Sequence, residues 1–152
     1  MPTAQPTEGR SAPPLQSDLD LMDALAQLSF MLQGALARRA AAHDLSLIQT
    51  RLLGVLRDRR PTMQELAQLL ELDKSSVTGL IDRAERRGLV HRSPSSDDRR
   101  SVRVKLSPAG RRVAQQVVAA FQQDIDTATA HLTSGERDRL RALAASVVAG
   151  AT

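Results

Sequence analysis

The feature that most constrains the fold is a change in apolar spacing at Gly88. Before it, two short segments repeat apolar residues at helical intervals, and after it apolar and charged residues alternate, as in strands. Thr62 with Glu65 forms a capping box that begins the first segment, and Gly88 follows the second, where a helix end favours a left-handed residue. Two short helices joined by a turn at 71–73, followed by a hairpin, predict a helix-turn-helix with a wing.

The predicted hairpin has strands at 89–93 and 102–106. In the second strand apolar and basic side chains alternate, which places Val102, Val104 and Leu106 on one face. The loop between the strands is polar and of hairpin length. Its charged tip consists of Asp97, Asp98, Arg99 and Arg100.

Segments with longer apolar stripes flank this region. We expect Ser17 to cap the first helix, Ser46 and Gln49 to form a capping box for the next, and Ser107 with Pro108 to begin a long helix. A last helix begins after Thr133 or Ser134. The predicted parts are a disordered tail (1–16), an N-terminal dimerisation helix (17–45), a winged helix-turn-helix (46–107) and C-terminal dimerisation helices (108–152). The fold class is therefore mainly α with a minor β part.

The flanking helices carry more apolar surface than a monomer of this size can bury. Leucines recur along one side of the first helix and other apolar residues lie on its other faces, so one neighbour cannot cover it. A second copy of the chain is the expected partner. The residues expected at this interface are Leu21, Leu25, Phe30, Leu140, Leu143 and Val147.

Composition favours double-stranded DNA as a further partner. Residues 44–112 contain fifteen Lys or Arg against nine Asp or Glu, a net charge of +6, whereas the flanks are acidic overall. Trp and Tyr are absent, which argues against single-stranded nucleic acid, whose bases stack on aromatic rings. The absence of cysteine excludes disulfides and thiolate sites. No stretch is long and apolar enough to predict a membrane span or a signal peptide, so we expect a cytoplasmic protein.

The helix over 74–87 has an outer face unusual for a solvated helix. With its apolar stripe turned inward, small, uncharged side chains point outward near its N-terminus, where they can enter a major groove. The alternative is a surface helix whose Ser and Thr residues are merely N-terminal. The candidate DNA-binding residues are Lys74, Ser75, Ser76, Thr78, Gly79, Arg83 and Arg86.

The charged hairpin tip has two interpretations as well. In isolation, a run such as Asp97–Arg100 is most simply a solvated loop. Beside a recognition helix, a carboxylate can orient an arginine that enters a minor groove, where the potential is most negative.

These features together resemble the MarR family of winged helix-turn-helix regulators. The resemblance rests on 75–90, on the tip Asp97–Arg100 and on the exit 106–110, and it is specific over 46–110. It implies that Arg99 is the minor-groove residue and Asp97 its orienting partner, although the doubled residues leave Asp98 with Arg100 as an alternative.

The resemblance also implies a homodimer that binds a pseudo-palindromic operator and responds to a small aromatic or phenolic effector. Candidate effector contacts are Met31, Ala35, His43 and Arg51, each of which is otherwise ordinary core or surface. Subtypes that use a cysteine or a tryptophan are set aside, because neither residue occurs. A zinc-sensing subtype is disfavoured, since His43, His91 and His131 are scattered.

The expected function is sequence-specific transcriptional regulation, with repression as the first interpretation and activation left open. The chief alternative is a winged helix that binds another protein, and a variant is a non-specific DNA binder. No catalytic pattern, phosphate loop or cofactor site is visible, so we expect no enzyme activity and no cofactor.

Overall fold

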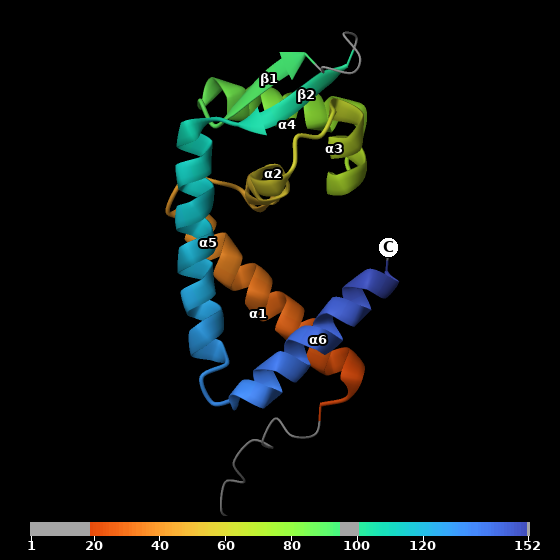
Figure 1. Cartoon of the computed structure of the whole chain (residues 1–152), viewed down its shortest axis with the longest axis vertical. Helices are drawn as coiled ribbons and strands as arrows, with labels where there is room; N and C mark the ends of the chain where they lie inside the picture. Colours follow the sequence, from red (N-terminus) through yellow and green to blue (C-terminus); the bar gives the residue numbers. More distant parts are fainter. Residues whose placement is uncertain (1–18, 95–100, 152) are drawn as a thin grey trace, which may run out of the picture. The chain divides into compact units, whose positions relative to one another are not determined.

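The computed structural model describes residues 19–94 and 101–151, so the predicted tail, Ser17 and the hairpin tip Asp97–Arg100 lie outside the described residues. The elements in chain order are α1 (Leu21–Ala41), α2 (Leu47–Asp58), α3 (Met63–Leu70), α4 (Lys74–Arg86), β1 (Val90–Pro94), β2 (Val102–Leu106), α5 (Pro108–Ala128) and α6 (Ser134–Gly150) (Figure 1). This confirms the predicted fold class of helices with one small antiparallel sheet. The chain divides into two units, residues 1–33 and 34–152.

The first unit contains the N-terminal part of α1. The helix begins at Leu21, later than predicted, because the Asp20 carboxylate accepts a hydrogen bond of 2.8 Å from the Asp23 amide and so supplies the cap. Large apolar side chains along this part of the helix are exposed, with Leu21 at 76% and Phe30 at 73%. This unit therefore leaves its own apolar face uncovered.

The second unit has a core built from α2 to α5 and the hairpin. α2 contacts α5 and β2, while α3 contacts α4 and α4 contacts β1. The largest fully buried side chains are Leu52, Leu66, Leu70, Val77, Leu80, Ile81, Val90 and Val104. Both predicted capping boxes, Ser46 with Gln49 and Thr62 with Glu65, are formed. The core thus fixes α3 and α4 against the hairpin.

The connection from α4 into the hairpin follows the expected chemistry with a shift of one residue. Gly88 has φ +67°, and the amides of Gly88 and Leu89 bond to the last turn of α4 in the Schellman pattern. Because Leu89 closes the helix in this way, β1 starts at Val90 rather than at 89, and Val90 pairs with Leu106. Val102 is 38% exposed although its face-mates are buried, since it lies at the end of the strand farthest from the core.

The start of α5 is packed closely against this connection. Ser107 caps the helix as predicted: its hydroxyl accepts from the Gly110 amide at 2.9 Å and donates to the Gly88 carbonyl at 2.5 Å. A Cβ atom on Gly110 would lie 1.9 Å from the Leu89 carbonyl oxygen. The contact between α5 and the hairpin hinge therefore requires glycine at 110.

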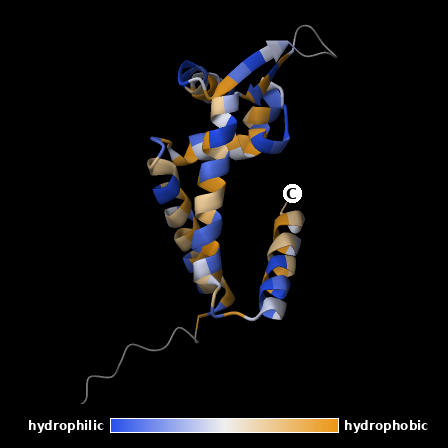
Figure 2. Cartoon of the chain, turned by 60° about the vertical axis from the view of Figure 1, so that its left-hand side comes forward, coloured by the Kyte–Doolittle hydropathy of each residue, from blue (hydrophilic) through white to orange (hydrophobic). Residues whose placement is uncertain are grey.

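The last helix is exposed along its whole length. Thr133 is its N-cap, in a capping box with Glu136, which decides between the two predicted starts. None of its residues is buried. Figure 2 shows hydrophilic colours over its N-terminal part and hydrophobic colours towards its C-terminal end. Among the described helices, none has the length and apolarity needed to cross a membrane.

Candidate nucleic-acid interface

The N-terminus of α4 is held by Asp73, the residue before the helix. Its carboxylate accepts hydrogen bonds from the Ser76 amide at 2.9 Å, from the Ser75 hydroxyl at 2.6 Å and from the Ser76 hydroxyl at 2.6 Å. The bonds from the Ser75 hydroxyl and then from the Ser76 hydroxyl and amide hold the pKa of Asp73 well below its ordinary value. The carboxylate is therefore ionised at neutral pH, where it also complements the helix dipole.

The predicted recognition residues form one exposed face of α4. Lys74, Ser75, Ser76, Thr78, Arg83 and Arg86 are exposed, and Gly79 is half-buried among them. The Thr78 hydroxyl donates to the Lys74 carbonyl at 2.8 Å. The apolar stripe of the same helix (Val77, Leu80, Ile81 and Ala84) is buried, as predicted from its spacing. After the basic Lys74 at the first position of α4, the face is therefore small and uncharged from Ser75 to Gly79 and basic from Arg83 to Arg86.

An arginine on β1 joins the hairpin to this helix. The Arg92 guanidinium donates to the Asp82 carboxylate at 2.6 Å and to the Glu85 carboxylate at 2.5 Å, and the Arg92 amide donates to Glu85 at 3.2 Å. The two acidic groups keep the pKa of Arg92 above its ordinary value despite partial burial. The hairpin base and α4 therefore present a single surface.

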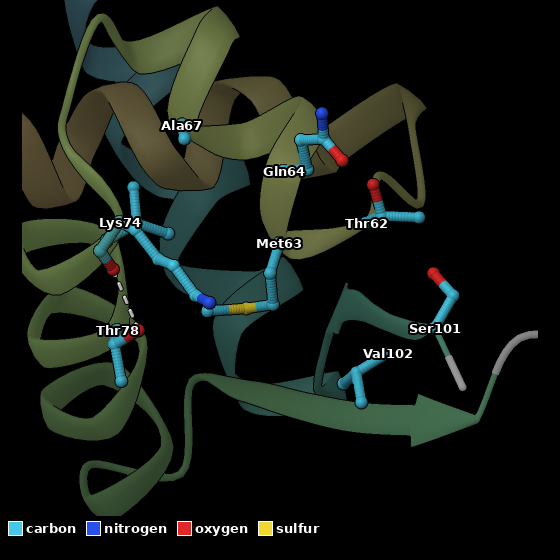
Figure 3. Close-up of a pocket in the computed structure, with 9 residues that line it drawn as sticks. Thr62, Met63, Gln64, Ala67, Lys74, Thr78, Ser101 and Val102 are labelled. Carbon is cyan, nitrogen blue, oxygen red and sulfur yellow. Dashed lines mark hydrogen bonds between the residues drawn. The ribbon is translucent and has the colours of Figure 1, made fainter.

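A hollow of about 370 Å³ lies beside the face, between α3, α4 and the start of β2; we call it the interface groove. It is lined by Thr62, Met63, Gln64, Ala67, Lys74, Val77, Thr78, Ser101 and Val102. In Figure 3 the side chains of Lys74 and Met63 point into the hollow, with Thr62 and Gln64 along one side and Val102 across from them. The groove thus combines an ammonium group, polar groups and apolar walls.

Sequence reasoning missed three parts of this interface. Asp73 stands where an N-cap is expected, so its local signal was present in the chain. The pairing of Arg92 with α4 and the groove residues of α3 depend on how α3, α4 and the hairpin pack, and spacing alone does not reveal them. The hairpin tip with Arg99 lies outside the described residues, and its role stays a prediction.

Comparison with known proteins agrees with this geometry. The model of the MarR family matches residues 43–101. The transcriptional repressor NicR from Pseudomonas putida is 32% identical over 101 residues, which span 66% of this chain and 64% of NicR. The structure of wild-type MarR from Escherichia coli superposes with a TM-score of 0.70 at 27% identity, covering 85% of this chain and 97% of that one. Residues 43–101 of this chain thus match the MarR family, and the MarR structure extends the likeness over most of the chain.

At lower sequence identity, the likeness to solved structures shows the fold alone. MepR from Staphylococcus aureus superposes with a TM-score of 0.71 at 17% identity, covering 88% of this chain and all of that one. The sequence alignment spans slightly less than two thirds of the length of NicR. NicR and several other curated relatives are named as regulators of transcription, which agrees with the prediction of a regulator without enzyme activity.

A second hollow, of about 220 Å³, lies among α1, α2 and α5 within the second unit. Its walls are mostly apolar, and two arginines, Arg51 and Arg57, stand among them. We call it the α2–α5 pocket. It is lined by Leu36, Leu45, Thr50, Arg51, Leu53, Gly54, Arg57, Ala114, Val117, Val118 and Phe121.

Of the four predicted effector contacts, only Arg51 lines the α2–α5 pocket. Ala35 is buried, and His43 is half-buried with its carbonyl accepting from Arg87 at 2.9 Å. Met31 lies in the first unit and is exposed. Among the described residues, no group of His, Asp and Glu is arranged to hold a metal ion.

The predicted dimerisation residues are all exposed in the single chain. They are Leu21, Leu25 and Phe30 on α1, with Leu140, Leu143 and Val147 on α6. Met22, Met31 and Val148 add to the same two helices. Large apolar side chains exposed in this number on a monomer mark an interaction surface.

Proposed function

We propose that this protein regulates transcription by binding a pseudo-palindromic operator in duplex DNA as a homodimer. The observation that carries the proposal is the exposed N-terminal face of α4, where short polar side chains and Gly79 leave room for base edges. Repression is the mode we propose, because NicR is named a repressor. The protein-binding alternative does not require a glycine and small polar side chains on the exposed face beyond the helix cap.

The groove and the hairpin extend the contact to the DNA backbone. With α4 in the major groove, the adjoining sugar–phosphate strand would enter the interface groove, where Lys74 and the first turn of α3 face it. The hairpin held by Arg92 would then bring Arg99, oriented by Asp97, or Arg100 by Asp98, to the next minor groove. This last step follows from the family resemblance.

Two copies are proposed because one chain leaves its terminal helices uncovered. The exposed apolar residues of α1 and α6 would pack against those of the second subunit, which removes them from water. A two-fold axis then places two α4 helices about one helical turn of DNA apart.

Selection from a library of random DNA duplexes tests this function. The purified protein is expected to enrich a palindromic site that it binds on the order of a thousandfold more tightly than a scrambled duplex of equal length. Affinities are compared at fixed salt, because phosphate contacts release counterions. Equal affinity for both duplexes would contradict sequence-specific regulation and favour the non-specific alternative.

Replacing Gly79 with alanine is expected to separate stability from recognition. A Cβ atom there would lie 3.3 Å from the flexible end of Arg83, so the helix accepts it and gains about 0.5–1 kcal/mol of stability. The added methyl group stands between the helix and the base edges, so operator affinity should fall at least about fivefold, the equivalent of roughly one hydrogen bond. Thermal unfolding and fluorescence anisotropy measure the two effects. An increase in both the stability of the fold and the affinity for the operator would exclude this face from the DNA contact.

We also propose that a small aromatic anion in the α2–α5 pocket controls DNA release. The pocket offers an apolar surface for a ring and the guanidinium of Arg51 for a carboxylate or phenolate. α2 contacts α3 and α5, so a ligand between α2 and α5 can bias the position of the DNA-binding elements. The family resemblance supports this class of effector.

Salicylate, as a simple aromatic carboxylate, serves as the probe for this pocket. It should release the selected duplex, and Arg51→Met should raise the concentration required about tenfold or more, because a charged hydrogen bond is lost. Arg112→Met, on the exposed side of α5, is the matched control and should respond like the unchanged protein. An unaltered response in Arg51→Met would remove Arg51 from the proposed site.

A further inference from the structure

We propose that Asp73 is a positioning residue that sets the hydrogen-bonding polarity of the recognition face. It turns Ser75 and Ser76 into hydrogen-bond acceptors, so that this part of α4 selects the major-groove amino groups of adenine or cytosine. The inference rests on the proposed DNA-binding function and names the class of base group that is read.

The argument begins with the protons of the hydroxyl groups. A serine hydroxyl has one proton to donate and two lone pairs that accept. The Ser75 hydroxyl donates to Oδ1 of Asp73 and the Ser76 hydroxyl to Oδ2, each at 2.6 Å. Both side chains remain exposed, so their lone pairs face the solvent while their protons are engaged.

Thr78 completes the same pattern one turn further along the helix. Its hydroxyl donates to the Lys74 carbonyl at 2.8 Å, and the side chain is exposed. All three hydroxyl protons are thus engaged in hydrogen bonds within the protein. In the major groove the complementary groups are N6–H of adenine and N4–H of cytosine, whereas N7, O6 and O4 need a donor.

A carboxylate is the side chain that imposes this polarity on both serines. When ionised it accepts on both oxygens and donates on neither, and its lowered pKa keeps it ionised through the physiological range. An asparagine at this position would still cap the helix, because its oxygen can accept from the Ser76 amide and the Ser75 hydroxyl. Its amide nitrogen, in place of Oδ2, would donate to Ser76 and free the Ser76 proton to point outward.

Asp73→Asn is therefore expected to change the Ser76 hydroxyl from an acceptor to a donor towards the DNA while the N-cap of α4 is kept. Glu71→Gln is the matched control: it removes the same charge two residues away, on an exposed side chain outside the recognition face. Ser76→Ala identifies the base pair that Ser76 contacts. Circular dichroism and thermal unfolding show whether each variant retains the fold.

The readout is the affinity for analogues of the duplex selected by the unchanged protein. Each adenine is replaced in turn by 2-aminopurine and each cytosine by 2-pyrimidinone, which lack the major-groove amino group, and each purine by its 7-deaza form, which lacks N7. At the base pair sensitive to Ser76→Ala, loss of the amino group should weaken binding about fivefold to tenfold and loss of N7 should have no effect. Asp73→Asn should abolish that amino-group sensitivity, and Glu71→Gln should retain it.

Two results would overturn the inference. In the first, the unchanged protein loses affinity when N7 is removed, and not when the amino group is removed, at the base pair sensitive to Ser76→Ala. This test needs no Asp73 variant. The other is an Asp73→Asn profile identical to that of the unchanged protein. Both results require an enriched duplex. If the selection enriches no duplex, the proposed function itself is contradicted, so the two failures are distinguishable.

Discussion

Replacing Gly110 with alanine is expected to destabilise the protein by at least about 3 kcal/mol, the upper range for overpacking a closed site. The new Cβ atom would lie 1.9 Å from the Leu89 carbonyl oxygen and 2.8 Å from its carbonyl carbon. Both neighbours are backbone atoms at the hinge where α4 ends and β1 begins, so no side-chain rotation can relieve the clash. α5 would have to move away from the hairpin.

Thermal unfolding at a fixed protein concentration measures this effect, because formation of the proposed dimer would make the midpoint depend on concentration. The midpoint of Gly110→Ala should fall by roughly 10 °C. Gly54→Ala is the matched control: a Cβ atom at Gly54, inside α2, meets no heavy atom within 4 Å. That substitution should leave stability unchanged or raise it by up to about 1 kcal/mol. Equal midpoints for the two variants would contradict the close packing described for Gly110.

Placing glutamates at Leu143 and Val147 together is expected to dissociate the proposed dimer and to weaken operator binding about 10²- to 10⁴-fold, because the second half-site then no longer binds from the same molecule. These side chains are 58% and 62% exposed in the single chain, so the monomer tolerates the change. In the dimer, each carboxylate would be removed from water without a partner.

Size-exclusion chromatography with light scattering and fluorescence anisotropy test both effects. The matched control is Arg141→Glu combined with Ala145→Glu, which adds glutamates on roughly the opposite side of α6 at 100° per residue. The control should stay dimeric and keep most of its affinity for the operator. A Leu143 and Val147 variant that remains a dimer would show that this side of α6 lies outside the interface.

The parts of the fold that follow from short-range chemistry could be predicted from the chain. The capping boxes at Ser46 and Thr62 and the left-handed Gly88 form because each involves residues within a few positions of one another. The predicted start of α1 after Ser17 was wrong because the helix begins at Leu21, where the Asp20 carboxylate accepts from the Asp23 amide and caps the first turn.

The features that could not be predicted depend on contacts between elements. Gly110 belongs to a sequence pattern typical of the family, but its approach to Leu89 exists only once α5 packs on the hinge. The pairing of Arg92 with Asp82 and Glu85 likewise needs β1 to lie along α4. The recognition face was predicted residue by residue, whereas the direction of its hydroxyl protons required the position of Asp73.

Native mass spectrometry of the protein bound to its selected duplex tests the central claim that paired chains present two α4 faces to one double helix. Two copies of the chain per duplex are expected, on a palindrome whose half-site centres lie about 10–11 base pairs apart, and removal of one half-site should lose most of the affinity. One copy per duplex, or two copies on a site without two-fold symmetry, would contradict the account.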